Sequence, residues 1–228
     1  MGEAGVAEWR VHLTPVHFGI GWWAEQVVPR ITDVALGTKD VRGHRERVVP
    51  GLHGTVVEIG FGSGLNVPLY PEGVDVVYAV DPSAVGRKLA TKRVAESSVP
   101  IEFIGLDGEH LQLDDASVDE ALSTFTLCTI PNAAQALHEL LRVLRPGGRF
   151  HFLEHGLCPE PNVARWQHRL NGMQQRVAGG CHLDRPIDRL VRDAGFDIRD
   201  LRNDWFRGPP PSKPWGYLYE GVATKPDS

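Results

Sequence analysis

The chain of 228 residues lacks long apolar runs, basic tracts and a secretion signal. No uncharged apolar run reaches the roughly 18 residues that a membrane-spanning helix needs, and the N-terminus lacks the basic-then-apolar order of a signal peptide. The 24 Lys and Arg residues are outnumbered by 29 Asp and Glu residues, which gives a formal charge of -5. We therefore expect a cytoplasmic protein with no transmembrane segment. We do not expect a nucleic-acid partner, because phosphate binding requires a basic surface.

Cysteine is also scarce. Only Cys128, Cys158 and Cys181 occur, and they are too few and too scattered for a disulfide framework or a Cys-x-x-Cys metal site. This scarcity favours a reducing compartment and predicts no bound metal. The chain length suits one α/β domain with a modest appendage, and nothing in the sequence indicates an oligomeric state.

The most informative segment present is Val56–Gly64, where an apolar strand carrying Glu58 runs into three alternating glycines. Glycine lets bare backbone approach a ligand because it has no Cβ and tolerates positive φ. A dinucleotide fingerprint requires G-x-G-x-x-G, but Leu65 stands where the third glycine would be. The acid at the strand end repels phosphate and suits a ligand with an ammonium group. An ordinary tight turn is the alternative interpretation.

A second buried strand, Val74–Val80, ends in Asp81-Pro82. An acid at the tip of this strand is placed to accept both hydroxyls of a ribose, whereas the alternative for Asp81 is to cap a helix that starts near Ser83. Further strands are predicted at residues 101–106, 118–125, 149–153, 196–201 and 215–223, with helices at 132–144, 162–177 and 186–194. The alternation predicts a doubly wound, mostly parallel α/β sheet of seven strands.

These motifs, in this order, resemble those of the class I S-adenosylmethionine (SAM)-dependent methyltransferases. The resemblance covers roughly residues 48–223 and is carried by Glu58–Gly64, Asp81, Asp107-Gly108-Glu109, Val118-Asp119 and Leu144–Gly148. Shorter segments resemble the animal alkyl-thiol methyltransferases and their bacterial relatives, namely Thr126-Leu127-Cys128, Phe152–His155, Gly180-Cys181 and Trp215-Gly216-Tyr217. The resemblance implies a Rossmann-like methyltransferase sheet and SAM as the cofactor.

The resemblance also implies which residues hold the cofactor. Glu58 and the glycine loop would hold the methionine end, Asp81 the ribose, and Asp107 with the Gly108 backbone the adenine, while Leu127 would flank the sulfonium. The complete predicted set is Glu58, Gly60, Phe61, Gly62, Gly64, Asn66, Asp81, Pro82, Asp107, Gly108, Glu109, Thr124 and Leu127.

His155, just past the fifth predicted strand, is the candidate general base, and Glu154 is the candidate residue that orients it. The alternative is a strand-end histidine that only caps hydrogen bonds. Cys128 is expected to line the pocket rather than to act as a nucleophile, and Cys181-His182 is a further candidate for facing the acceptor.

Residues 1–48 differ in composition from the methyltransferase domain that we predict at 49–228. Trp9, Phe18, Trp22 and Trp23 stand in this segment, and we predict one or two short helices that form a cap or lid over the cofactor cleft. Padding of the sheet is one alternative. Peripheral contact with a membrane is another, although the cationic face that such helices need is thin.

The predicted activity is methyl transfer from SAM to a small acceptor, a thiol or a phenolic or quinol oxygen. A quinone-ring carbon, a phospholipid amine and a catalytically silent SAM-binding regulatory protein are the alternatives. A thiol costs about 2 kcal/mol to ionise at pH 7 and a phenol about 4 kcal/mol. A thiol acceptor therefore requires less help from a base.

Overall fold

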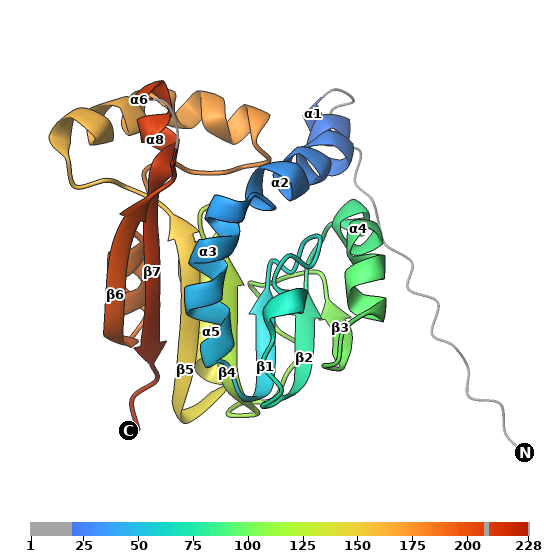
Figure 1. Ribbon diagram of the computed structural model, residues 1–228. Helices are drawn as coiled ribbons and strands as arrows, with labels where there is room; N and C mark the ends of the chain where they lie inside the picture. The colour runs from blue at the N-terminus through green and yellow to red at the C-terminus, as the bar shows by residue number, and fades with distance from the viewer. Residues whose placement is uncertain (1–19, 208–209, 228) are drawn as a thin grey trace, which may run out of the picture.

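The computed structural model describes residues 20–207 and 210–227 of the protein. Its centre is a seven-stranded sheet with the strand order β3-β2-β1-β4-β5-β7-β6, and helices surround the sheet (Figure 1). Strands β3, β2, β1, β4 and β5 are mutually parallel, whereas β7 is antiparallel to both β5 and β6. The predicted doubly wound, mostly parallel α/β fold is therefore confirmed.

Every predicted strand is present. The strands are β1 (Gly54–Ile59), β2 (Val74–Val80), β3 (Ile101–Gly105), β4 (Val118–Thr124), β5 (Leu144–His155), β6 (Asp197–Trp205) and β7 (Tyr217–Thr224). β2 has the predicted bounds, and β6 extends four residues beyond its predicted end. The apolar run Val56, Val57 and Ile59 of β1 is fully buried, as expected of a parallel strand that is covered on both faces.

Helices fill the intervals between the strands. They are α1 (Ile20–Trp22), η1 (Trp23–Val27), α2 (Val28–Leu36), α3 (Lys39–Val48), η2 (Val49–Gly51), η3 (Val67–Leu69), α4 (Ala84–Ala95), α5 (Ala133–Val143), α6 (Pro161–Val177), α7 (Ile187–Asp193), η4 (Pro210–Ser212) and α8 (Lys213–Gly216). The three helices predicted after residue 130 are confirmed as α5, α6 and α7, to within one residue at each end.

The junction between α5 and β5 corrects one expectation. We expected the Pro146-Gly147-Gly148 turn to end the helix and the strand to begin at Arg149. Instead α5 ends at Val143 and β5 begins at Leu144, whose backbone is already extended. The strand begins earlier than expected because Leu144 already pairs with Val118 of β4.

The core lies on both faces of the sheet. α5 and α7 contribute the fully buried Leu137, Leu140 and Val191 to the larger cluster. α3 and α4 contribute to the second cluster, through Val48 and Ala90. Because each fully buried aliphatic side chain stabilises the fold by about 1.5–3 kcal/mol, these layers hold the carboxyl ends of the strands in fixed positions.

The strand order reverses between β1 and β4. In open α/β sheets the ligand crevice forms at this reversal, beyond the carboxyl ends of the strands. Figure 1 shows α1 and α2 crossing above that edge, with α3 lying against the sheet below them. Trp22 and Trp23 belong to these N-terminal helices, whereas Trp9 and Phe18 lie outside the described residues.

Candidate cofactor site

The loop after β1 carries two glycines that the site requires for different reasons. Gly60 has φ +71°, and a Cβ there would lie 1.7 Å from Thr126 Oγ1, so only glycine permits the loop after β4 to approach. Gly62 has φ +55°, and a Cβ there would meet only the Gly60 carbonyl oxygen, at 3.8 Å. The loop therefore offers uncovered backbone at Gly62, the kind of cradle that a closely approaching ligand needs.

A buried polar network joins β1 to β4 at the reversal point. Glu58, which is 1% exposed, accepts a hydrogen bond from Asn66 Nδ2 at 2.8 Å and another from the Tyr70 hydroxyl. Asn66 Nδ2 also donates to Thr124 Oγ1 at 3.0 Å. The structure thus brings together three predicted cofactor residues, Glu58, Asn66 and Thr124, that are far apart in the sequence.

Arg45 of α3 enters this network, and sequence reasoning missed it. Its Nη1 donates to Asn66 Oδ1 and to Thr124 Oγ1, both at 2.7 Å. The side chain is buried, and its Nε has no hydrogen-bond partner among the residues that the structure describes. A buried guanidinium nitrogen without a partner is costly, so this donor is suited to an anionic group of a ligand. Its signal in the sequence is its spacing, since Arg45 shares a helix face with Val41 and Val48.

Burial sets the charge state of this network. Desolvation raises the pKa of Glu58 to about 7, although the hydrogen bonds from Tyr70 and Asn66 and the charge of Arg45 oppose that rise. Desolvation also lowers the pKa of Arg45 to about 10, which leaves it charged at neutral pH. The site therefore presents a carboxylate that is ready to ionise beside a guanidinium, a pair that matches the ammonium and carboxylate of an amino acid.

Asp81, at the tip of β2, supports the glycine loop. Its carboxylate accepts hydrogen bonds from the backbone N–H of Gly62 at 2.8 Å and of Ser83 at 2.7 Å. The N-cap of α4 is Ser83, whose hydroxyl accepts from Gly86 N at 2.9 Å. Each carboxylate oxygen can accept more than one hydrogen bond, so Asp81 retains acceptor capacity for a ribose.

The loop after β3 carries the residues predicted at the adenine. The exposed Asp107 accepts from Glu109 N at 2.8 Å and contacts His110, and the carboxylate of Glu109 accepts from Asn132 N. Gly108 is buried, and a Cβ there would lie 3.1 Å from Ile130 and 3.4 Å from Ile59. These contacts leave Asp107 accessible and place Gly108 beside an apolar wall.

Two other predicted residues have their side chains in the core. Phe61 is 3% exposed and packs edge-on against Phe103, and Leu127 is fully buried. Only the backbone of Phe61 is available to a ligand, whereas Pro82 is exposed next to Asp81. The predicted contact of Leu127 with a sulfonium stays a prediction.

Glu154 differs from its expected role. Among the described residues no hydrogen bond joins Glu154 to His155. Its carboxylate instead accepts from Ser123 Oγ at 2.7 Å, Thr126 N at 3.0 Å and Cys128 N at 3.3 Å. The reason is the pleat of β5, because adjacent side chains on a strand point to opposite faces. Glu154 therefore fixes the loop after β4, in which Phe125 adopts the left-handed region with φ +56°.

His155 lies at the end of β5 against a cysteine. Its Nε2 is 3.3 Å from Cys181 Sγ, which is 3.8 Å from Cys128 Sγ. Cys128 and Cys181, which are 53 residues apart in the sequence, therefore lie side by side in the structure. Burial lowers the pKa of His155, but the neighbouring Cys181 raises it to a net value above the ordinary one. Its role as a base stays a prediction that requires Cys181 to move aside.

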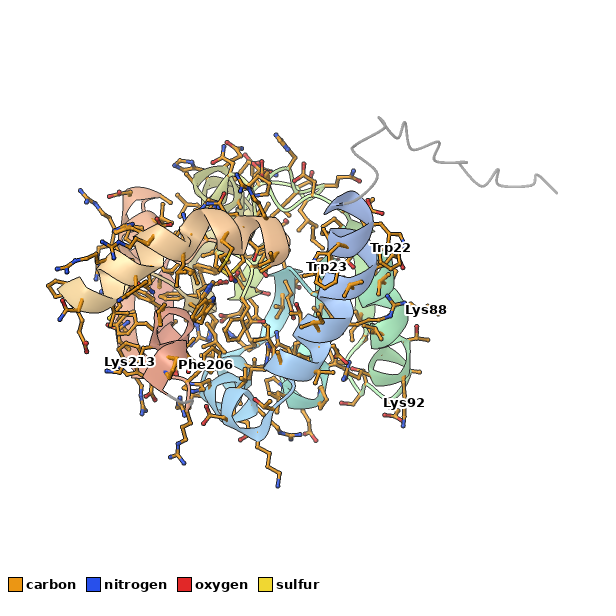
Figure 2. All side chains as sticks on the ribbon, turned by 90° about the horizontal axis from the view of Figure 1, so that it is seen from above. Trp22, Trp23, Lys88, Lys92, Phe206 and Lys213 are labelled. Atoms are coloured by element: carbon orange, nitrogen blue, oxygen red, sulfur yellow. The ribbon has the colours of Figure 1, made fainter. Side chains whose placement is uncertain are left out.

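The N-terminal helices connect the two sides of the crevice. Trp23 Nε1 donates to the carbonyl oxygen of Val177, at the end of α6, at 2.9 Å. On the other side, Arg93 of α4 bonds both Asp33 of α2 and the Ser63 carbonyl of the glycine loop. Figure 2 shows this edge from above, with Trp22 and Trp23 on the N-terminal helix beside α4.

One cavity of about 480 Å³ is lined by Tyr78, Leu111, Gln112, Leu113, Asp114 and Ser117. None of these residues belongs to the predicted site, so this cavity does not mark the cofactor-binding position. Between residues 20 and 227, with the gap at 208–209, no helix has the length and apolar character to cross a membrane.

Several known proteins that are similar to this chain are methyltransferases. A family model described as a methyltransferase domain matches residues 57–152. Thiol S-methyltransferase TMT1B of Rattus norvegicus is 35% identical over 193 residues, which are 82% of this chain and 75% of the relative. Phosphatidylethanolamine N-methyltransferase of Cereibacter sphaeroides is 27% identical over 147 residues, 64% of this chain and 71% of the relative.

A solved structure shares the fold. The putative methyltransferase of Haloferax volcanii, determined with the Trm112 methyltransferase activator, superposes with a TM-score of 0.67 and 19% identity, over 93% of this chain and 100% of the other. The glycine cradle at Gly62, the acid at Asp81 and the charged pair of Glu58 and Arg45 fit an amino-acid-bearing nucleoside. The chain belongs to the class I methyltransferases, and its cofactor is S-adenosylmethionine.

Proposed function

We propose that the protein transfers the methyl group of SAM to the sulfur of a small thiol. The observation that carries this proposal is the 35% identity to a thiol S-methyltransferase across 75% of that relative's length. The second candidate is methylation of a phospholipid amine. It has weaker support, because the identity to a phospholipid-amine methyltransferase is only 27%. Oxygen acceptors, a quinone-ring carbon and a silent SAM-binding role are outcomes that the test below distinguishes.

When bound, SAM supplies a methyl group on a positively charged sulfur. We propose that Glu58 holds its amino group, that the free Nε of Arg45 faces its carboxylate, and that Asp81 accepts the ribose hydroxyls. Asp107 and the Gly108 backbone would hold the adenine. Because the displacement is in line, the protein has mainly to align the acceptor and exclude water, and alignment of this kind can supply about 7–11 kcal/mol.

Replacement of Asp81 by alanine tests the ribose contact. We expect the affinity for SAM to fall by about 1.5–3 kcal/mol, roughly 10–150-fold, because two charge-assisted hydrogen bonds are lost. Calorimetry on the folded variant measures this change. Because Asp81 also holds the Gly62 N–H, Asp81→Asn serves as the control that keeps the shape and one acceptor oxygen. Unchanged affinity in Asp81→Ala would restrict Asp81 to a structural role.

The ratio of kcat/KM for thiols to that for phenols tests the acceptor class. A thiol with a pKa of about 8.5 ionises more readily than a phenol with a pKa of about 10, which is worth about 30-fold in anion concentration at neutral pH. We expect kcat/KM at pH 7 to be at least about 30-fold higher for thiols than for phenols of similar size, and to rise with pH until the thiol is ionised. Methyl transfer from labelled SAM to a panel of thiols, phenols, quinones and phospholipid amines measures the ratio.

Two results would contradict the proposal. Preference for a phospholipid amine would move the protein to the second candidate, and absence of methyl transfer to every acceptor would indicate a silent SAM-binding protein. SAM binding measured on the same preparation shows in either case that the cofactor site is intact.

We further propose that residues 20–37 act as a lid. Trp23 and Arg93 tie this segment to both sides of the crevice, and closure would exclude water from the reaction. α3 is different, because its Val41, His44 and Val48 are buried against the sheet. The boundary between lid and methyltransferase domain therefore fits better before Lys39 than at residue 48. Peripheral membrane contact through the exposed Trp22 stays a prediction.

A further inference from the structure

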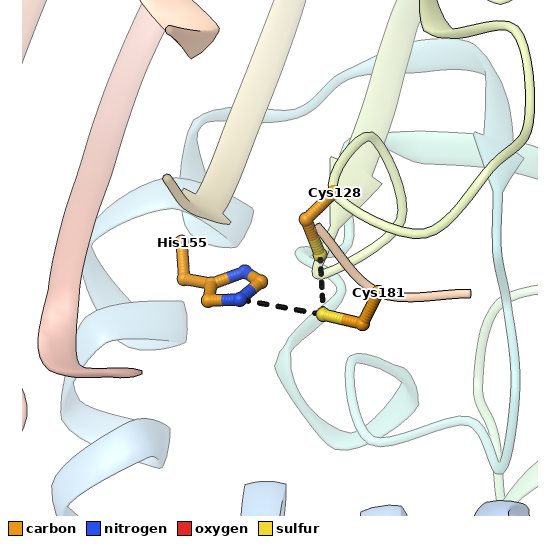
Figure 3. A group of neighbouring side chains, drawn as sticks. All are labelled: Cys128, His155 and Cys181. Carbon is orange, nitrogen blue, oxygen red and sulfur yellow. Dashed lines mark hydrogen bonds between the residues drawn. The ribbon is translucent and has the colours of Figure 1, made fainter. Parts of the chain in front are cut away.

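Three potential metal ligands from distant parts of the sequence meet beyond the carboxyl ends of β4 and β5. Cys128 follows β4, His155 ends β5, and Cys181 lies in the loop after α6. One ligand atom of each residue lies within 4.8 Å of the other two. Figure 3 shows the imidazole of His155 and the thiol of Cys128 both directed toward the Cys181 sulfur.

Two of the three separations are close to those of tetrahedral zinc. With Zn–S bonds of about 2.3 Å and a Zn–N bond of about 2.0–2.1 Å, a tetrahedron places two sulfur ligands about 3.8 Å apart, and sulfur about 3.6 Å from nitrogen. The Cys128 and Cys181 sulfurs are 3.8 Å apart, and Cys181 Sγ is 3.3 Å from His155 Nε2. A disulfide would instead require the sulfurs at about 2.05 Å.

The surroundings favour a metal ligand set. Cys128 and His155 are buried, at 2% and 7% exposure. The nearby guanidinium of Arg185 does not compete for the sulfurs, because it donates to the carbonyl oxygens of the loop after β4. Two thiolates would neutralise a divalent cation, and thiolate with imidazole is a donor set that suits zinc.

A second group of potential metal ligands differs because a basic side chain already lies among them. His44, Asp204 and Glu220 also lie close together. However, Arg47 donates to Glu220 through Nε at 2.7 Å and Nη2 at 2.6 Å, and its Nη2 lies 3.5 Å from Asp204. A cation is already present there, so this group is an ion-pair network. No such basic side chain stands between Cys128, His155 and Cys181 in the described part of the chain.

We propose that Cys128, His155 and Cys181 bind one Zn²⁺ and leave its fourth coordination position open. Three protein ligands with an open position are typical of catalytic zinc sites, whereas structural sites are closed by four. Cys128 directly follows Leu127, the residue predicted at the sulfonium. If the proposed thiol acceptor is correct, on which this last step rests, its thiolate occupies the open position, and the thiol proton passes to solvent.

To test this site, the full-length, fully reduced protein is titrated with Co²⁺ in the absence of SAM. Co²⁺ can take the place of Zn²⁺, and its absorption spectrum depends on the ligands that bind it. We expect one equivalent to bind, with sulfur-to-cobalt charge-transfer absorption and tetrahedral visible bands that Zn²⁺ abolishes. Cys128→Ser, Cys181→Ser and His155→Gln should each weaken binding by at least about 100-fold, since even residues behind the ligands cost 10–100-fold.

Cys158→Ser is the matched control, because Cys158 is a buried cysteine outside the cluster, and its spectrum should equal that of the wild type. Circular dichroism checks that each variant folds; if Cys128→Ser does not fold, the more exposed Cys181→Ser decides. Absence of charge-transfer absorption in the wild type, or its persistence in folded Cys181→Ser, would overturn the zinc site.

Addition of ethanethiol to the Co²⁺-loaded protein tests the open position. We expect a further charge-transfer contribution from a third sulfur ligand, and an unchanged spectrum would show that the position is closed. Because these spectra need neither SAM nor turnover, they are independent of the acceptor panel. A metal site without thiol methylation would refute the proposed function alone, and thiol methylation without a metal site would refute this inference alone.

Discussion

Glu58→Gln is expected to lose most of the affinity for SAM and, at the same time, to stabilise the ligand-free protein at alkaline pH. The carboxylate is the proposed partner of the cofactor's ammonium group, and truncating one side of a buried charge pair costs about 2–5 kcal/mol. We therefore expect SAM to bind roughly 30- to 5,000-fold more weakly. Calorimetry at pH 8, where the wild-type carboxylate is ionised, measures this loss.

The stability change follows from the raised pKa. Glu58 has a pKa of about 7 in the folded protein, against an ordinary value of 4.5. Between these values the folded state holds a proton that the unfolded state has released, so the free energy of unfolding falls as the pH rises from 4.5 to 7. Glutamine does not ionise, so the Glu58→Gln variant does not lose stability in this way. We expect Glu58→Gln to gain about 2–3 kcal/mol relative to the wild type between pH 5 and pH 8, measured by urea unfolding at both values.

The same ionisation predicts how SAM binding depends on pH. Below pH 7 the wild-type site must release a proton before it can pair with an ammonium group. The dissociation constant should therefore rise up to tenfold per pH unit below 7, and Glu58→Gln should lack this dependence.

Glu120→Gln is the control for these experiments, because Glu120 is an equally buried strand carboxylate with a different setting. It is paired with Arg149 at 2.6 Å and His151 at 2.8 Å, away from the predicted cofactor residues. We expect its replacement to lower stability and to leave the affinity for SAM unchanged. A Glu58→Gln variant that binds SAM normally would remove Glu58 from the site.

Arg45→Met should produce a loss of similar size at the other end of the same amino acid. The guanidinium lies beside Asn66 and Thr124, and its buried Nε has no partner within the described part of the chain. We expect it to bind the cofactor's carboxylate. Loss of this contact should weaken SAM binding by about 2–5 kcal/mol. Methionine preserves much of the apolar stem, so the packing of α3 against the sheet is largely retained.

A decarboxylated analogue of SAM separates this role from a structural one. The wild type should bind the analogue much more weakly than SAM, whereas Arg45→Met should bind the two with similar affinity. Arg42→Met is the matched control, because Arg42 lies on the same helix with an exposed side chain that pairs with Glu46. An Arg45→Met variant that still discriminates fully between SAM and the analogue would contradict the proposed contact.

Much of the fold could be predicted from apolar runs and capping residues within short segments. The apolar run of β2 ends at Asp81, and both its bounds are as predicted because a short buried strand followed by Asp-Pro has few alternatives. α5 begins after Asn132, whose side chain caps it. The junction at Leu144 was misplaced, since strand pairing with Val118 extended β5 further back than the glycines suggested.

The sequence allowed candidate site residues to be named only where their chemistry is tied to a motif. Gly62 and Asp81 follow the ends of β1 and β2, Glu58 lies near the end of β1, and parallel strands bring such ends to one edge. Arg45 was missed because its helix is rich in charged residues, and only the spacing shared with Val41 and Val48 marks it as facing inward. Glu154 was expected to orient His155 because the two are adjacent in the chain, but its hydrogen bonds within the described residues go to Ser123 and to the loop after β4, and its role toward His155 stays a prediction.

The sequence by itself determined the alternation of strands and helices and the glycine loop, because these depend on periodicity and spacing within short segments. The cofactor was implied by the resemblance of these motifs to those of the SAM-dependent methyltransferases. Only the tertiary structure decided that Arg45 reaches Glu58's network, that Glu154 fixes the loop after β4, and that Cys128, His155 and Cys181 converge. The physical reason is that burial, pKa and ligand geometry depend on distances in space. Packing of α3 and of the loop after α6 sets those distances between residues that are far apart in the chain.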